Sequence, residues 1–324
     1  MLPTSAEVLA ASQRLRGVAV RTPLVRSATL TSRLGAEVFL KCEQQQRTGS
    51  FKLRGAYNAL AVLPMEARGR GVVAASAGNH GLGVAYAARS LAIHAKIFVP
   101  ATAPEVKRLG IVALGAELDL TSPDYDAAHQ AAELYAREHG MWFVDACKGA
   151  PLLAGQGTVA VEILDVLPHV RTLIVPVGGG GLVGGISAFV RSAARGVHVI
   201  GVQSDRTNAM AASLAAGRRV PVAVTATLAD GLAGQIDDEG YEIGRVAIDE
   251  METVSEAQIA DAISALARDH GTRVEGSGAV GVAALLSGRT GTITGPVAVV
   301  LSGGNIDDDR WKGLVNRESS DVVT

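Results

Sequence analysis

The chain has 324 residues, of which 48% are hydrophobic and 19% are charged, so it can bury a sizeable core and is not intrinsically disordered. Its net charge of -2 and its aromatic content of 4% argue against a surface built for nucleic acid or for an acidic membrane. Two cysteines, Cys42 and Cys147, lack Cys-x-x-Cys spacing and indicate reduced thiols without a zinc site. No secretory signal or membrane span is visible, and we expect a cytoplasmic protein.

The N-terminal part predicts a helix over residues 5–16 with its apolar positions toward the core. An extended segment follows at residues 21–24, since the residue before a proline avoids the helical region. We then expect a short helix at residues 30–34 and a strand at residues 36–42.

From residue 71 onward, short apolar strands alternate with helices. The expected strands cover residues 71–75, 95–99, 117–120, 141–144, 172–177, 197–202 and 297–301. The expected helices cover residues 82–91, 105–114, 122–139, 158–167, 183–195, 255–270 and 278–286. Residues 222–241 are less regular, and the charged tail from residue 308 is expected to fray at its end. The alternation predicts an α/β fold with mostly parallel sheets covered by helices, and the length suggests two domains.

A lysine lies between the strand at residues 36–42 and the next helix-like run. The sequence GSFKLRGA at residues 49–56 places Lys52 at the positive end of a helix dipole. There the ammonium is disfavoured, which makes a neutral, nucleophilic amine more available. Read alone, the motif is more typical of a solvated surface lysine, but three downstream glycine-rich turns favour the chemical interpretation.

Four glycines in a row, Gly178, Gly179, Gly180 and Gly181, precede Leu182 between a buried strand and a helix. The backbone N–H groups of such a turn converge on an anion at the helix N-terminus, so we expect a phosphate site. The Gly-Lys-[Ser/Thr] ending of a nucleotide-binding P-loop is missing, and the turn comes too late in the chain for a dinucleotide fold.

Two more turns follow predicted strands. Residues 76–81, with the sequence SAGNHG, combine a hydroxyl, an amide, an imidazole and backbone donors, which suits the carboxylate of an amino acid. The plain alternative is that Asn79 caps a helix and His80 lies on the surface. Residues 302–305, with the sequence SGGN, offer Ser302 either to a ring nitrogen or as a helix cap.

A lysine, a phosphate turn, a carboxylate turn and a hydroxyl together meet the needs of pyridoxal 5′-phosphate. From residue 21 to residue 305, the chain resembles the serine/threonine dehydratase branch of the fold-type II pyridoxal-phosphate enzymes, which also contains serine racemase. The motifs SFKLRGA at residues 50–56 and SAGNHG at residues 76–81 carry this resemblance. It implies a tryptophan synthase β-like fold of two α/β domains.

The resemblance also implies a role for each matching residue. Lys52 would hold the cofactor and move the α-proton, with Phe51 beside the ring. Asn79 would bond the ring 3-hydroxyl, and Ser302 would meet the pyridine nitrogen. The phosphate would lie on residues 178–182. The substrate carboxylate would lie on Ser76, Ala77, Gly78, Asn79 and His80. Glu275 resembles a family glutamate near the cofactor.

The implied reaction is β-elimination of L-threonine, L-serine or both, to the 2-oxo acid and ammonia. A neutral Ser302 does not keep the pyridine nitrogen protonated, which weakens the electron sink and favours elimination over racemisation. Ala77 stands where serine racemase has its second acid/base serine, so racemisation should be weak. Gln203, Thr207 and Ala209 replace an acidic cation site, so we expect no metal.

Other functions stay open at this point. A sibling ammonia-lyase would act on 3-hydroxyaspartate or another 3-hydroxy amino acid. Residues 122–125 and 230–238 are expected at the entrance and contain no arginine for a second carboxylate, although Arg54 could reach. Serine racemase is a further alternative. A ligand-binding protein that keeps the fold without chemistry is disfavoured by Lys52, and a nicotinamide-dependent oxidoreductase by the turn layout.

The resemblance and the strand–helix alternation also predict the domain layout. Residues 1–47 with 151–324 would form a large cofactor-binding domain, and residues 48–150 a small mobile domain that closes over the substrate. The expected partner is a small amino acid, with no nucleic acid or membrane. A homodimer is the family expectation.

Overall fold

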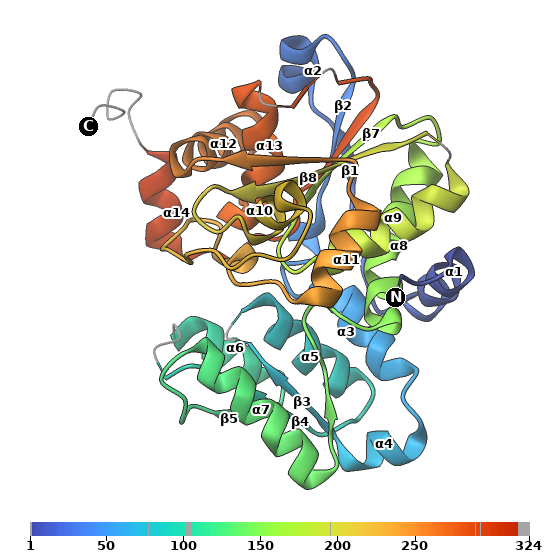
Figure 1. Ribbon diagram of the computed structural model, residues 1–324, viewed down its shortest axis with the longest axis vertical. Helices are drawn as coiled ribbons and strands as arrows, with labels where there is room; N and C mark the ends of the chain where they lie inside the picture. The colour runs from blue at the N-terminus through green and yellow to red at the C-terminus, as the bar shows by residue number, and fades with distance from the viewer. Residues whose placement is uncertain are drawn as a thin grey trace.

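A computed structural model describes residues 2–316, except residues 77, 102–104, 195, 289 and 292. It has two lobes, each built around one sheet, with the chain crossing between them (Figure 1). No helix in the described part of the chain is long and apolar enough to cross a membrane.

The larger sheet has six strands in the order β1-β2-β10-β7-β8-β9. Their bounds are Leu24–Arg26 (β1), Val38–Lys41 (β2), Val297–Val300 (β10), Thr172–Pro176 (β7), His198–Ser204 (β8) and Glu250–Val254 (β9). The pairings are parallel except between β1 and β2. The central strands β7 and β10 are buried along their whole length, as expected for parallel strands covered on both faces.

Helices cover both faces of this sheet. Alternate residues of β7 divide between two cores, because Leu173 and Val175 pack on one side and Ile174 on the other. The first side carries α1 (Ser5–Arg14), α8 (Ala150–Val166), α9 (Gly181–Ala193), α10 (Ala209–Ala216) and α11 (Asp238–Ala247). The second side carries α2 (Ala28–Leu34), α12 (Glu256–His270), α13 (Gly276–Ser287) and α14 (Asp308–Val315).

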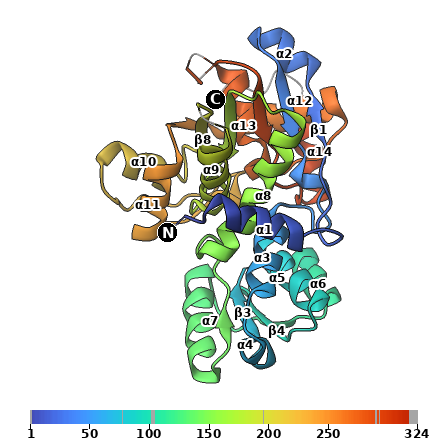
Figure 2. The same cartoon turned by 90° about the vertical axis from the view of Figure 1, so that its right-hand side faces the viewer.

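The smaller sheet has four parallel strands in the order β5-β4-β3-β6. Their bounds are Glu117–Asp119 (β5), Ala95–Phe98 (β4), Val72–Ala75 (β3) and Trp142–Phe143 (β6). Its helices are α4 (Met65–Arg70), α5 (Asn79–Ser90), α6 (Glu105–Ala113) and α7 (Tyr125–His139). Helix α3 (Lys52–Ala61) lies at the junction of the lobes and packs on α5 and α8 (Figures 1 and 2).

The predicted α/β class is confirmed, and the predicted strands and helices are present with ends shifted by a few residues, except that α8 begins at Ala150, eight residues before the helix predicted at residues 158–167. The charged tail from residue 308 was expected to fray at its end, and that end, residues 317–324, lies outside the described residues. Asp308–Val315, at the start of this stretch, forms α14. Trp311 and Leu314 of this charged helix pack against the second core, and that burial stabilises it. Helices α4, α10 and α11, strand β9 and the 3-10 turns Glu43–Gln45 and Asp230–Leu232 were not predicted.

Candidate functional site

The two lobes meet around a cavity of about 1020 Å³. Its wall includes residues that follow β3, β6, β7 and β10, at the carboxyl ends of parallel strands. Every predicted site residue in the described part of the chain lines it: Phe51, Lys52, Ser76, Gly78, Asn79, His80, Gly178, Gly179, Gly180, Gly181, Leu182 and Ser302. Ala77, the remaining predicted residue, lies outside the described residues. The structure therefore brings together turns that are far apart in the sequence.

Lys52 begins α3 and extends its amine into the cavity wall. Its Nζ donates to the Ala146 carbonyl at 2.8 Å and lies 4.0 Å from the Cys147 Sγ. The preceding residues are tied to the turn after β10, because Phe51 N–H donates to the Ser302 carbonyl at 3.1 Å. This hydrogen bond holds the backbone that precedes Lys52 beside the Ser302 turn.

The glycine loop, residues 178–181, connects β7 to α9 and must be free of side chains. A Cβ on Gly179 would lie 2.8 Å from the Cys147 Sγ, and one on Gly181 would lie 2.9 Å from the Cys147 Cα. Gly180 has a φ of 93°, which side chains rarely tolerate. No side chain caps α9, so its first N–H groups stay available at the cavity wall for an anion.

The turn after β3 leads into α5 without a side-chain cap. Gly78 N–H donates to the Ser76 Oγ at 3.1 Å. His80 is 3% exposed, and its Nε2 lies 2.9 Å from the Val144 carbonyl. A carbonyl only accepts, so Nε2 carries the ring proton. Burial, followed by the Lys52 charge, lowers the pKa of His80 to about 4. The ring is therefore neutral near pH 7, and its Nδ1 has no donor to offer a carboxylate.

Asn79 joins two polar side chains from the larger lobe. Its Nδ2 donates to the Glu275 Oε1 at 2.7 Å, and its Oδ1 accepts from the Asn305 Nδ2 at 2.6 Å. Ser302, on the same wall, is 3% exposed and directs its Oγ at the Ser277 carbonyl across a long 3.4 Å. Such a weak bond leaves the hydroxyl free to turn toward a ligand.

The segment after β6 was missed by the sequence reasoning. Residues 145–148 line the cavity, and the Asp145 Oδ1 accepts from the N–H groups of Cys147 and Lys148 at 2.7 and 3.0 Å. Lys148 also pairs with Asp237, which caps α11. Position at the carboxyl end of a predicted parallel strand was the available signal for this segment.

The entrance differs in one respect from expectation. Asp124 and Tyr125 line the cavity as predicted, and so do residues 230–237. Arg54, however, is 1% exposed and bonded to Glu43 and Glu162, outside the wall. Arg219 instead reaches the wall, where its Nε lies 2.7 Å from the Asp238 Oδ1.

The described residues contain no group of three or more His, Cys, Asp or Glu side chains that could hold a metal ion. Near β8, the Gln203 Oε1 accepts from the Ala211 N–H at 2.9 Å, so this oxygen is already engaged. The absence of a metal requirement stays a prediction.

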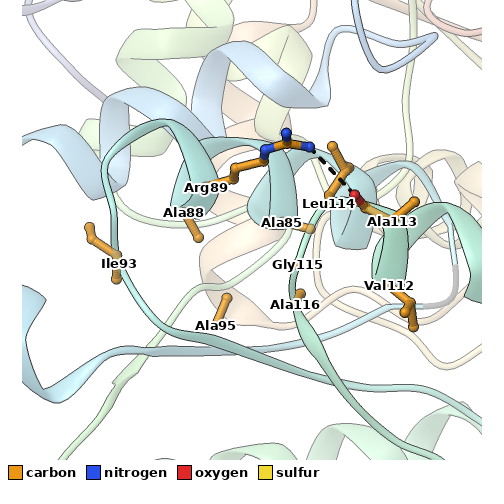
Figure 3. Close-up of a pocket in the computed structure, with 10 residues that line it drawn as sticks. All are labelled: Ala85, Ala88, Arg89, Ile93, Ala95, Val112, Ala113, Leu114, Gly115 and Ala116. Atoms are coloured by element: carbon orange, nitrogen blue, oxygen red, sulfur yellow. Dashed lines mark hydrogen bonds between the residues drawn. The ribbon is translucent and has the colours of Figure 1, made fainter.

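A second hollow, of about 300 Å³, lies between α5, α6 and β4 (Figure 3). Its lining is almost entirely small and apolar. Among the described residues of this lining Arg89 is the one charged side chain, and its Nη1 donates to the Ala113 carbonyl at 3.4 Å. Because the lining residues that the structure describes bring no polar side chains together, this hollow is a weaker candidate than the cavity between the lobes.

Comparison with known proteins shows the family to which the chain belongs. A family model described as pyridoxal-phosphate dependent enzyme matches residues 15–303. An L-threonine ammonia-lyase of Thermotoga maritima is 43% identical over 97% of this chain and 78% of its own length. The structure of maize serine racemase superposes with a TM-score of 0.92 at 29% identity, covering 97% of both chains. Threonine deaminase isoform 2 of Solanum lycopersicum gives a TM-score of 0.90 at 31% identity, over 96% of this chain and 89% of that one.

Proposed function

The chain belongs to the family of pyridoxal-phosphate dependent enzymes, and on this premise we propose that it is a lyase that converts L-threonine, and L-serine, to the 2-oxo acid and ammonia. The observation that carries the proposal is the 43% identity to an L-threonine ammonia-lyase over 97% of this chain. An intact Lys52 on the cavity wall supports it, because a fold retained without chemistry would not need this amine.

The residues around the cavity fit pyridoxal 5′-phosphate. The glycine loop, residues 178–181, leads into the uncapped N-terminus of α9 and suits the phosphate. Lys52 offers a primary amine, and the Ser302 hydroxyl suits a ring nitrogen. When bound, the cofactor supplies an aldehyde that condenses with amines and a ring that withdraws electrons from the substrate Cα.

We propose that Lys52 is the general base that takes the α-proton. The Ala146 carbonyl, 2.8 Å from Nζ, holds the side chain in one direction when the amine is free. Ser302 presents a neutral hydroxyl, so the ring nitrogen need not carry a proton, and electrons are better released with the β-hydroxyl than stored at Cα. This arrangement favours elimination over racemisation.

For the substrate carboxylate we propose the turn after β3, with the Ser76 hydroxyl and the backbone N–H groups at the start of α5 as donors. The His80 ring has a structural role instead, because its Nε2 proton bonds to the Val144 carbonyl and so links α5 to the segment after β6. Asn79 would face the ring 3-hydroxyl.

The predicted domain layout belongs to the same proposal. Residues 48–150 would be the small mobile domain, and residues 1–47 with 151–324 the large one, because the carboxylate turn and the glycine loop lie on different lobes. A homodimer in the cytoplasm, working without a divalent metal, remains the expectation.

A second candidate substrate class is 3-hydroxyaspartate. Arg219 favours it, because this guanidinium reaches the cavity wall and a second substrate carboxylate could compete with Asp238 for it. The pairing with Asp238 already satisfies Arg219, and for this reason threonine and serine come first.

The test is an assay of the purified protein with pyridoxal phosphate against L-threonine, L-serine and 3-hydroxyaspartate, following 2-oxo acid and ammonia. We expect 2-oxobutanoate from threonine at the highest kcat/KM, in equal amount to ammonia, with D-serine forming from L-serine far more slowly than pyruvate. A preference for 3-hydroxyaspartate would move the assignment to the sibling enzyme. Racemisation as fast as elimination would contradict the mechanism.

A further inference from the structure

Asn305 lies outside the cavity wall and hydrogen-bonds to the side-chain amide of Asn79, which lines the cavity. Its Nδ2 donates to the Thr48 carbonyl at 2.8 Å and to the Asn79 Oδ1 at 2.6 Å. Asn79 lines the cavity, whereas Asn305 is not part of the wall. The three residues come from the segment before Lys52, the start of α5 and the turn after β10. A single amide therefore links the three segments that frame the site.

The sense of this hydrogen-bonded chain is fixed at both ends. The Thr48 carbonyl can only accept, so the Asn305 Nδ2 must point toward it. The Asn79 Nδ2 donates to the Glu275 carboxylate at 2.7 Å, so its Oδ1 must face Asn305. An amide flip of either asparagine would set two acceptors against each other. One hydrogen of the Asn79 Nδ2 remains for a group inside the cavity.

The backbone makes room for this arrangement. Gly49 has a φ of 73°, and a Cβ there would lie 2.2 Å from the Asn305 Oδ1. Gly304 N–H donates to the Gly49 carbonyl at 2.9 Å, and Ser50 pairs with Gly303 in an isolated antiparallel bridge. The Asn305 side chain thus occupies the space that a side chain at position 49 would fill.

We propose that Asn305 is a positioning residue for the cofactor. Its Nδ2 donates to the Asn79 Oδ1 and so holds the Asn79 amide in one orientation. In that orientation the second hydrogen of the Asn79 Nδ2 points at the oxygen of the cofactor ring. The inference rests on the pyridoxal phosphate site of the proposed function. Asn305 itself touches neither the cofactor nor the substrate. Its effect is carried by the direction of one amide.

Two substitutions separate positioning from packing. Asn305→Asp keeps the size and shape of the side chain but replaces its Nδ2 donor with a carboxylate oxygen. That oxygen would attract the Asn79 Nδ2 and so turn the Asn79 Oδ1 toward the cofactor ring. Asn305→Ala removes most of the side chain but leaves the hydrogen bond from Asn79 to Glu275 in place. Positioning therefore predicts a larger defect for N305D than for N305A, and packing predicts the reverse order.

The measurement is the dissociation constant of pyridoxal phosphate from the holoenzyme on dilution, followed by the visible absorption band, together with the pH at which that band titrates. We expect about a tenfold or greater weakening and a displaced titration for N305D, and a smaller change for N305A. The control is Asn58→Asp. Asn58 is a buried asparagine outside the cavity wall, and its Nδ2 donates to the Pro151 carbonyl at 2.6 Å. This variant should retain the affinity and the titration of the unaltered protein.

Two results would overturn the inference. N305D that binds and titrates like the unaltered protein would mean that Asn79 needs no orienting partner. A defect larger in N305A than in N305D would mean that Asn305 only fills space. Either result leaves the proposed function standing if the unaltered protein binds pyridoxal phosphate and releases 2-oxobutanoate. An unaltered protein that binds no pyridoxal phosphate would overturn both.

Discussion

At the scale of single residues, burial changes what a side chain can do. His80 reads in sequence as one more polar group near a carboxylate. In the structure its Nε2 bonds to the Val144 carbonyl and burial keeps the ring neutral, so it cannot act as a cationic anchor. Sequence alone does not predict this, because the carbonyl partner comes from a strand end more than sixty residues away.

The pH dependence of stability tests the state of His80. Its pKa of about 4 lies below the ordinary value of 6.5, so between these values the unfolded chain binds a proton that the folded chain does not. The stability contributed by the neutral ring is complete above pH 6.5 and is lost as the pH falls toward 4. Between these pH values His80 lowers the free energy of unfolding by up to about 1.4 kcal/mol for each pH unit of acidification. His80→Gln removes this contribution, so we expect the unfolding temperature to decline less steeply over this window. Parallel curves for the two proteins would show that His80 does not titrate this way.

At the scale of elements, the turns that follow strands were predictable because their signals are local. Four consecutive glycines between an apolar run and a helix indicate an anion site by themselves. The Asn79–Asn305 bond and the Lys148–Asp237 pair were not predictable, since the first joins residues 226 positions apart and both depend on how the lobes meet. The packing of Trp311 of α14 against the core was not predictable for the same reason, because a core contact is not a local property.

Gly180 offers a test of the loop between β7 and α9. Gly180→Ala must either hold a side chain at a φ of 93° or shift the loop away from the conformation that presents its N–H groups to the cavity. The strain of about 1 to 2 kcal/mol should weaken pyridoxal phosphate about 5- to 30-fold, measured by titration of the visible band. Gly196→Ala is the control, since Gly196 has a φ of 83° in an exposed turn. Equal affinities for both variants would argue against the loop as the phosphate site.

Arg54 lies in the first turn of α3, and its buried guanidinium ties this turn to Glu43 and Glu162. It donates to Glu43 at 2.8 Å and to Glu162 at 2.7 Å, and both contacts are shielded from solvent. Burial alone would raise the pKa of Glu43, but Arg54 and Lys41 hold it below its ordinary range. Glu43 is therefore ionised in the folded protein and needs a buried cation beside it.

Arg54→Ala should lower the free energy of unfolding by about 3 to 5 kcal/mol, because Glu43 would stay buried without its main partner. Denaturant unfolding followed by far-UV circular dichroism measures the change. Arg245→Ala, which removes a solvent-exposed pair with Glu242, should leave the unfolding curve in place. Unchanged stability of Arg54→Ala would mean that Lys41 compensates for the missing cation.

At the scale of the whole molecule, two sheets contribute opposite walls of one cavity. The Lys148–Asp237 pair crosses between them, because Lys148 follows β6 of the smaller sheet and Asp237 caps α11 over the larger one. The pair is formed in this structure, so any movement that separates the two lobes at this point would have to break it.

Asp237→Asn removes the charge and keeps a good helix cap. We expect KM for threonine to rise about two- to fivefold with an unchanged visible band, since a part-exposed ion pair contributes at most about 1 kcal/mol. Asp165→Asn is the control, because Asp165 pairs with Arg21 at 3.1 Å outside the cavity wall. Loss of kcat without a change in KM would point to a role in the chemistry instead.

The most direct test of the account is the visible absorption spectrum of the purified protein during addition of L-threonine, with 2-oxobutanoate measured in the same cuvette. We expect a yellow protein whose band changes while 2-oxobutanoate accumulates. Lys52→Ala should reduce product formation at least about a thousandfold without unfolding the protein. A protein that stays colourless with added pyridoxal phosphate, or a Lys52→Ala variant that forms product at the unaltered rate, would contradict the central claim that Lys52 holds the cofactor and carries the proton.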